Sequence, residues 1–286
     1  MARISAILLV VLAFAVPARA TLVAIVPSAQ GLVVAADSRL TFIGAACDGE
    51  FKIVQLARPA RTVVVVTGDS IFVPPPPAHT ADVCRYLATA PRLLDIDAVI
   101  RALLDRSLAD PASVSIQSLG AACVRAVRRF RRLYPAALEP YVGWPIFSVI
   151  VASYDPASRT ATLRDFKVRI DAHSKRIKLG KISQISVDMQ SPRRVWIYGE
   201  TGYVEKYVYD GFGRRFLTPP TLTFVRQHTP VRETTLGEAA AAAVNVIQAA
   251  SRATQTLPAP SGIGGAIRVV LLGRQPRPQA LPWAVP

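Results

Sequence analysis

The feature that most constrains this chain is a set of short, almost uninterrupted apolar runs in its first quarter. They cover residues 21–26, 32–36 and 63–66. Runs of this length, bounded by turn residues, are typical of strands buried on both faces of a sheet. The first two are separated by a turn that contains Gly31, which predicts a β-hairpin. We therefore expect a sheet that is covered on both sides.

The rest of the chain groups strands and helices in blocks. Further strands are predicted over residues 51–56, 62–67, 147–154, 160–166, 196–198 and 266–272, and helices over residues 81–107, 115–134, 235–253 and from about 201. Pro91 breaks the first helix, and Thr235 with Glu238 forms the capping-box pattern that opens the last one. Such blocks indicate an α+β fold rather than repeated βαβ units. If two sheets pack face to face with helices on the outside, both faces of each sheet are buried.

The first 20 residues have the three parts of a secretory signal peptide. Arg3 supplies the positive start, residues 6–16 are an unbroken apolar run, and Ala18-Arg19-Ala20 is the small-x-small pattern that a signal peptidase accepts. The run is short for a membrane-spanning helix, so cleavage is favoured over an uncleaved anchor. We expect a leader over residues 1–20, a domain over 21–273, a Pro-rich tail over 274–286, and an exported protein that is periplasmic or secreted.

The chain is strongly basic, with a formal net charge of +15. Part of this charge lies on one side of the predicted helix 115–134, where four arginines recur at helical spacing: Arg125, Arg128, Arg129 and Arg132. Such a face is usually solvated, but it could contact an anionic envelope surface or an acidic partner. No pattern of interleaved aromatic residues marks a nucleic-acid platform, so we do not expect nucleic acid as a partner.

Cysteine and histidine are sparse. The three cysteines are Cys47, Cys84 and Cys123. Their pairing cannot be deduced from the sequence; export would allow a disulfide, with at least one thiol left over. The three histidines lack metal-ligand spacing. We predict no metal site and no cofactor.

Cleavage after residue 20 would expose Thr21 with a free amine. The first hairpin gives its neighbour: if Val26 pairs with Leu32, Thr21 lies opposite Asp37. A carboxylate at the end of an apolar strand is costly to bury alone. It therefore needs a cation or hydrogen bonds, and Lys52 is the nearest lysine in the sequence.

These groups suffice for nucleophilic catalysis. A free α-amine has a pKa of about 8, near the optimum for a general base at neutral pH, and an N-terminal threonine carries both the amine and the hydroxyl. We predict that Thr21 attacks, that Lys52 keeps its amine neutral and that Asp37 orients Lys52. Gly68 is the candidate backbone donor to the oxyanion. Arg39 is a second candidate cation beside the carboxylate.

Several segments resemble proteasome β-type subunits, which are N-terminal-nucleophile hydrolases. The matching segments are residues 21–25 (Thr-Leu-Val-Ala-Ile), 31–39, 51–54 (Phe-Lys-Ile-Val), 147–155, 199–202 and 235–272, which span most of 21–273. The resemblance implies a four-layer αββα sandwich and threonine-dependent amide hydrolysis, and it adds Thr201 and Ser261 as supporting site residues. It also implies assembly of copies of the chain. Members of that family are normally cytosolic, whereas this chain has an export signal.

The sequence thus predicts an exported N-terminal-threonine hydrolase that cleaves amide bonds, with a peptide as the favoured substrate. One alternative is an inactive exported protein of the same fold that serves as a binding or assembly module. Another is a basic protein that binds the envelope through the arginine face.

Overall fold

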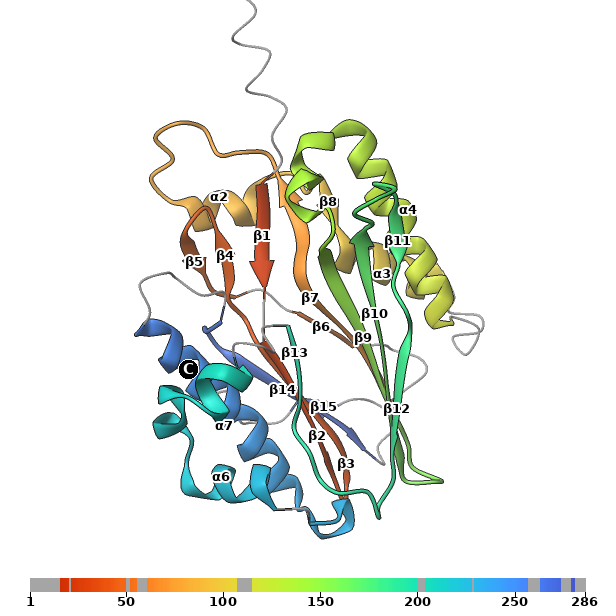
Figure 1. Cartoon of the computed structure of the whole chain (residues 1–286), viewed down its shortest axis with the longest axis vertical. Helices are drawn as coiled ribbons and strands as arrows, with labels where there is room; N and C mark the ends of the chain where they lie inside the picture. Colours follow the sequence, from red (N-terminus) through yellow and green to blue (C-terminus); the bar gives the residue numbers. More distant parts are fainter. Residues whose placement is uncertain are drawn as a thin grey trace, which may run out of the picture.

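The computed structural model describes residues 16–20, 22–49, 52–55, 61–106, 115–199, 204–227, 229–256, 263–273 and 279–280. These residues form two β-sheets and several helices (Figure 1). The mixture of strands and helices that the sequence predicts is confirmed. Within the described part of the chain, no helix combines the length and apolar character needed to cross a membrane.

The larger sheet is built around the long strand β7 (Thr62–Val73). Among the described residues it has ten strands. Its main order is β11 (Ile177–Leu179), β10 (Thr160–Ile170), β9 (Pro145–Asp155), β7, β1 (Val16–Ala20), β4 (Leu40–Phe42) and β5 (Ala45–Cys47). Strand β12 (Ser183–Val187) pairs with β10, and β6 (Ile53–Gln55) and β8 (Leu94–Asp95) pair with β7. The valine run 63–66 is buried in β7, as expected for a strand covered on both faces.

The smaller sheet contains the first predicted hairpin. Its order is β13 (Trp196–Gly199), β2 (Leu22–Ser28), β3 (Gly31–Asp37), β14 (Ile267–Gly273) and β15 (Gln279–Ala280). Every residue of β2 and β3 is buried. The two residues of β15 belong to the predicted Pro-rich tail and pair with β14, so this part of the tail adds to the sheet.

The helices follow the predicted blocks. Before β9 come α2 (Val83–Thr89), α3 (Ile96–Arg106), α4 (Ile116–Leu133) and the 3₁₀ helix η3 (Pro135–Tyr141); after β13 come η4 (Val204–Tyr209), η5 (Phe212–Phe216), α6 (Pro219–Arg226), η6 (Val231–Glu233) and α7 (Leu236–Gln255). The break between α2 and α3 contains Pro91, as predicted. The capping box at Thr235 and Glu238 is formed at the start of α7.

Among the described residues, three of the four apolar clusters join the two sheets to each other and to the long helices. One contains side chains of both sheets, among them Ile25 and Val34 of the smaller sheet and Val65 of β7. A second joins the larger sheet to α3 and α4, and a third joins the smaller sheet to α6 and α7. The two sheets therefore share one core, and each also packs against helices.

The register of the first hairpin differs by one residue from the prediction. Val26 pairs with Val33, and Ser28 pairs with Gly31 across a two-residue turn. The predicted pairing of Val26 with Leu32 is wrong because Pro27 and Ser28 continue the strand instead of starting the turn. With this register Leu22, rather than Thr21, is the residue level with Asp37.

Strand β1 is formed by residues 16–20, which the sequence predicts as the end of the leader and not as part of the fold. It pairs antiparallel with β7, from Val16 opposite Val73 to Ala20 opposite Gly68. On its other side it pairs with β4. The segment just before Thr21 therefore lies as an extended chain between two strands of the larger sheet.

Cys47 of β5 and Cys84 of α2 form a disulfide, which the sequence left open. It joins the edge of the larger sheet to α2. Cys123 is a free thiol on the inner face of α4, and burial raises its pKa to about 12. A thiol with this pKa is a poor nucleophile at neutral pH.

Candidate functional site

The site is centred on Asp37, the last residue of β3. Its side chain is fully buried and accepts three hydrogen bonds, from the backbone N–H of Leu22 (3.0 Å), the backbone N–H of Gly264 (2.8 Å) and Lys52 Nζ (3.0 Å). These donors come from the start of β2, the turn before β14 and the segment before β6. Three donors offset much of the cost of burying this side chain.

Lys52 is buried beside Asp37, with only 3% of its side chain exposed. Its Nζ also donates to the backbone carbonyl oxygen of Arg39. Burying a single ammonium group is costly, whereas a pair with further hydrogen bonds is tolerated. The structure thus brings Asp37 and Lys52 together, as the sequence predicted; their catalytic roles stay a prediction.

Thr21, Thr201 and Ser261 lie outside the described residues. The two neighbours of Thr21 in the chain are described: Ala20 ends β1 and Leu22 begins β2. The backbone N–H of Leu22 is bonded to the carboxylate that holds Lys52. The site is therefore built around the point where the chain passes from β1 to β2.

Arg39 forms a second ion pair next to the first. Its guanidinium donates two hydrogen bonds to Asp48, at 2.8 and 3.0 Å. These bonds raise the pKa of Arg39 and lower the pKa of the Asp48 carboxyl, and the nearby charge of Lys52 lowers the latter further. The arginine side chain thus pairs with Asp48 and not with Asp37, while its backbone carbonyl holds Lys52. The sequence reading missed Asp48.

Glycines let the turn before β14 approach the pair of Arg39 and Asp48. Gly265 has a φ of 71°, and a Cβ there would lie 2.7 Å from Asp48 Oδ1 and 2.6 Å from Ser38 Oγ. Only glycine fits such a backbone and such a close approach. The Gly-rich turn was visible in the sequence, but the contact of Gly264 with Asp37 was not predicted.

Gly68 lies in the middle of β7, between two strands. It is opposite Ala20 of β1 and Phe147 of β9. Its φ is 94°, and a Cβ would lie 2.8 Å from the carbonyl oxygen of Ile146. The residue next to it, Asp69, is buried and accepts a hydrogen bond from the hydroxyl of Tyr141. The candidate oxyanion donor thus lies beside Ala20, the last residue of the predicted leader.

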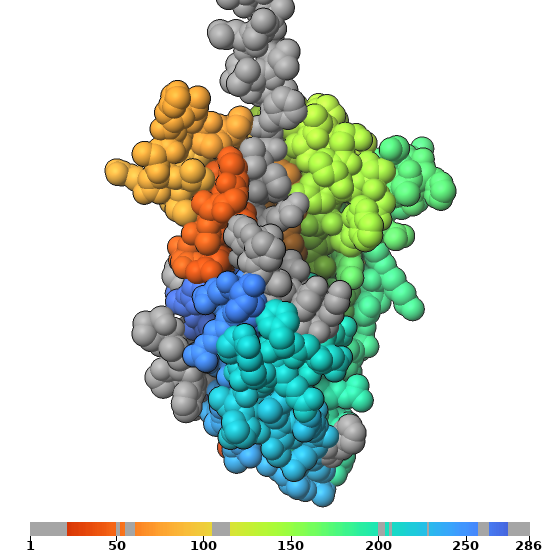
Figure 2. Space-filling view, turned by 60° about the vertical axis from the view of Figure 1, so that its left-hand side comes forward, coloured from red at the N-terminus to blue at the C-terminus, as the bar shows by residue number. Residues whose placement is uncertain are grey.

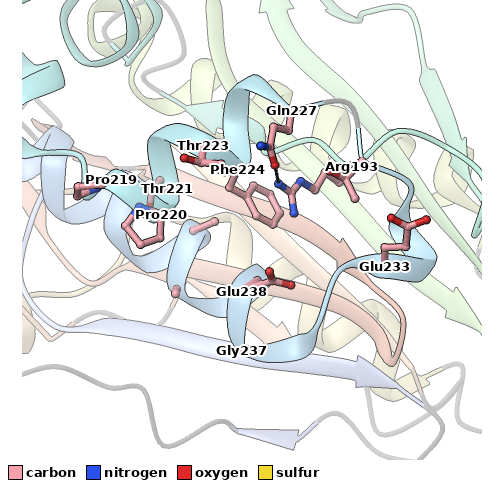
Figure 3. A pocket seen from close by; sticks show the side chains of 13 residues that line it. Arg193, Pro219, Pro220, Thr221, Thr223, Phe224, Gln227, Glu233, Gly237 and Glu238 are labelled. Carbon is pink, nitrogen blue, oxygen red and sulfur yellow. Dashed lines mark hydrogen bonds between the residues drawn. The ribbon is translucent and has the colours of Figure 1, made fainter.

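A separate cavity of about 710 Å³ lies between α6 and the start of α7 (Figure 3). There Arg193 stacks on the ring of Phe224 at 4.1 Å and donates to the side chain of Gln227. None of the predicted site residues lines this cavity. Within the described ranges, no group of histidine, cysteine and acidic side chains could hold a metal ion.

No protein-family model and no curated protein sequence matches the chain. Among solved structures, it is similar to a Gly-1 mutant of Anbu from Hyphomicrobium sp. strain MC1, with 16% identity over 91% of this chain and 87% of that one and a TM-score of 0.48. Anbu from Yersinia bercovieri, described as an ancestral beta-subunit, has 15% identity, coverages of 91% and 86% and a TM-score of 0.46. A helical assembly of the Anbu complex from Pseudomonas aeruginosa has 18% identity, coverages of 91% and 85% and a TM-score of 0.45.

These comparisons correct the family prediction. The predicted membership in the proteasome β-type subunits is wrong: the similar structures are Anbu proteins, at low identity. Apart from helix α7, the described parts of the segments that carry the resemblance are mostly buried strands and their turns. Their apolar sequences are favoured in any sheet core and therefore do not identify a family.

Proposed function

We propose that the chain is an exported hydrolase that uses Thr21 as an N-terminal nucleophile to cleave amide bonds in extended peptides. The observation that carries the proposal is the buried pair of Lys52 and Asp37 where β2 begins. The same carboxylate binds the backbone of Leu22 and the ammonium of Lys52. It therefore fixes a positive charge next to the residue that would become the N-terminus.

The proposed reaction needs only groups of this chain and water. Removal of residues 1–20 frees the amine of Thr21. That amine takes the hydroxyl proton, the oxygen attacks the amide carbon, and the proton passes to the departing nitrogen as the C–N bond breaks. The product is an ester on Thr21. Water, deprotonated by the same amine, then hydrolyses the ester and restores the hydroxyl.

Lys52 acts on this reaction through its charge. Its ammonium is held by a carboxylate and by the carbonyl of Arg39, so it does not need to move during the reaction. A fixed cation nearby favours the neutral form of an amine, which is the form that can accept a proton. Asp37 is then a positioning residue for both the lysine and the backbone.

The position of β1 supports an extended peptide as the substrate. Residues 16–20 pair with both β4 and β7. When the leader has left, the two facing strand edges can pair with another extended chain. A substrate residue in the place of Ala20 would lie opposite Gly68, whose N–H is the proposed donor to the oxyanion.

The proposal is tested with an unchanged leader junction and a change at the nucleophile. Thr21→Ala should abolish hydrolysis of extended peptide amides, whereas Thr21→Ser should keep part of the activity because serine supplies a hydroxyl. Both variants must be shown to start at residue 21. Full activity of Thr21→Ala would refute the assignment.

The second candidate function is an inactive binding or assembly module of the same fold. The pairing of β1 favours it, because a leader that stays in place leaves the nitrogen of Thr21 in a peptide bond and fills the space for a substrate. This candidate predicts that the recovered protein retains β1 and that no peptide is cleaved.

Export and the wider architecture are parts of the same proposal. The disulfide between Cys47 and Cys84 supports an oxidising compartment, periplasmic or extracellular. The apolar clusters support a four-layer αββα arrangement over residues 21–273. Assembly of copies of the chain stays a prediction.

A further inference from the structure

A cationic groove runs between α4 and the hairpin of β10 and β11. It has a volume of about 980 Å³. On the α4 side it is lined by five arginines: Arg125, Arg128, Arg129, Arg131 and Arg132. Lys175 and Arg176 line the opposite side. No acidic residue lines it, so a ligand in this groove meets a positive potential from both walls.

The groove is built into the fold and does not arise from loose side chains alone. The opposite face of α4 is buried through Leu119, Cys123, Val127 and Phe130, which directs the arginines outward. Arg128 donates to the carbonyl of Ile177 at 3.1 Å, and Arg131 donates to the carbonyl of Lys175. These bonds hold helix and hairpin together, and Figure 2 shows the two side by side at its upper right.

Most of the charge in the groove is uncompensated. In the described part of the chain, Arg131 pairs with Glu139 at 3.9 Å, but no ion pair involves Arg125, Arg129 or Arg132. Like charges three and four residues apart on a helix repel one another. A surface that keeps such repulsion is well suited to an anionic partner.

Two exposed apolar side chains lie in the elements next to the groove, although neither lines it. Leu133, the last residue of α4, is 67% exposed, and Trp144 is 69% exposed. Trp144 follows η3 and lies beside the β10–β11 loop, because the neighbouring Gly143 donates to the carbonyl of Ile170. Tryptophan is enriched at the headgroup level of a bilayer, where its ring meets both apolar and polar surroundings.

The position of the groove on the molecule also fits a membrane as the partner. The loop between β10 and β11 lies at the upper end of Figure 1, the end at which β1 begins. The chain thus enters the described fold at Val16 on the side that carries the groove. If the leader directs export, as proposed above, this side faces the membrane when the leader engages it.

We propose that this surface docks the protein on a bilayer with anionic headgroups, with arginines bound to lipid phosphates and with Leu133 and Trp144 in the interface. The guanidinium fork matches phosphate oxygens geometrically. The proposal does not depend on whether Thr21 reacts. It assigns the surface to a membrane and not to a soluble polyanion.

The test uses vesicles of phosphatidylcholine with and without phosphatidylglycerol, at low and at high salt. We expect sedimentation with the phosphatidylglycerol vesicles only, weakened by salt. Combining Arg125→Gln, Arg129→Gln and Arg132→Gln should weaken binding on the order of a hundredfold, because each cation near an anionic surface contributes about fivefold. The matched control combines Arg101→Gln, Arg214→Gln and Arg252→Gln, which removes the same charge from exposed sites elsewhere. All samples must have the same N-terminus.

A second readout reports the apolar contact. Brominated lipids in the vesicles should quench part of the tryptophan fluorescence of the unchanged protein, and Trp144→Phe should remove that quenching. Equal losses of binding in the two arginine triples would overturn the proposal, since total charge would then be sufficient. Binding to vesicles of pure phosphatidylcholine would also overturn the proposal. So would binding to polyglutamate or duplex DNA that is as tight as binding to the vesicles, if the brominated lipids quench no tryptophan fluorescence.

Discussion

Asp37 is the residue at which three separate parts of the chain meet. It receives N–H groups from Leu22 and Gly264 and the ammonium of Lys52. The sequence could predict the pair of Asp37 and Lys52, because a buried carboxylate needs a cation and Lys52 is the nearest lysine. It could not predict Gly264, which lies 227 residues away and approaches only through the fold.

Lys52→Met tests the central pair. Methionine keeps much of the volume but leaves Asp37 without its cation, so we expect the free energy of unfolding to fall by about 3 kcal/mol, as for other broken buried pairs. Peptide hydrolysis should also be lost. The measurement is urea unfolding together with a peptide assay.

The control for Lys52→Met is the double variant with Asp37→Asn. Once both charges are gone, the double variant should lose less stability than the sum of the single losses, because the two residues interact directly. Strict additivity would contradict the pairing.

Asp48→Asn tests the neighbouring pair with Arg39. Since this pair is partly exposed, we expect a loss of no more than about 1 kcal/mol at neutral pH. Because folding lowers the pKa of Asp48, its contribution is complete above the ordinary carboxyl pKa and is lost as the pH falls through the lowered value. Urea unfolding as a function of pH should show the difference from the unchanged protein closing in acid. A difference that grows in acid would be inconsistent with this pair.

At the scale of single elements, α7 shows how local sequence signals can define a structure. The hydroxyl of Thr235 accepts from the backbone N–H of Glu238, and the Glu238 carboxylate accepts from the backbone N–H of Thr235. The backbone bond to the carboxylate, together with a bond from the Thr235 hydroxyl, lowers the pKa of Glu238. Thr235 and Glu238 are only three residues apart, so the start of the helix can be predicted from the sequence.

Thr235→Ala should lower the free energy of unfolding by about 1 kcal/mol, because it removes the N-cap acceptor of α7. Thr235→Ser keeps the hydroxyl and should stay close to the unchanged protein. Thermal unfolding of the two variants side by side measures the effect, and equal losses would show that the cap hydroxyl is not responsible.

The first hairpin shows the limit of prediction for an element. Its two strands were predicted from their apolar runs, but the register was wrong by one residue. Proline is usually found in turns, whereas Pro27 here pairs with Leu32 inside the ladder. The predicted pairing of Val26 with Leu32 encloses five residues, whereas the observed turn has two, and the surrounding sheet decides between them.

At the scale of the whole molecule, two features could not be read from the sequence. Cys47 and Cys84 are brought together because α2 packs against the edge of the larger sheet. Strand β1 was assigned to the leader, and its pairing depends on β4 and β7 being correctly spaced. Both features depend on long-range packing, which local patterns do not contain.

The disulfide gives a prediction for the whole fold. Replacing Cys47 and Cys84 by serine should lower the free energy of unfolding by about 2–4 kcal/mol, because the crosslink restricts the unfolded chain. Peptide hydrolysis should fall by more than the loss of folded protein accounts for. Cys47 is adjacent to Asp48, which pairs with Arg39, and the backbone carbonyl of Arg39 accepts a hydrogen bond from Lys52. Chemical unfolding and a peptide assay on the folded fraction separate the two effects. Unchanged activity in that fraction would exclude the link to the site.

The central claim is that loss of residues 1–20 turns Thr21 into a reactive N-terminus. Its most direct test is mass spectrometry of the exported protein before and after treatment with a β-lactone or epoxyketone probe. We predict a chain that begins at Thr21 and carries one probe molecule on that residue, with no adduct on Thr21→Ala. A chain that begins at any other residue, or a Thr21 that stays unmodified, would contradict the account.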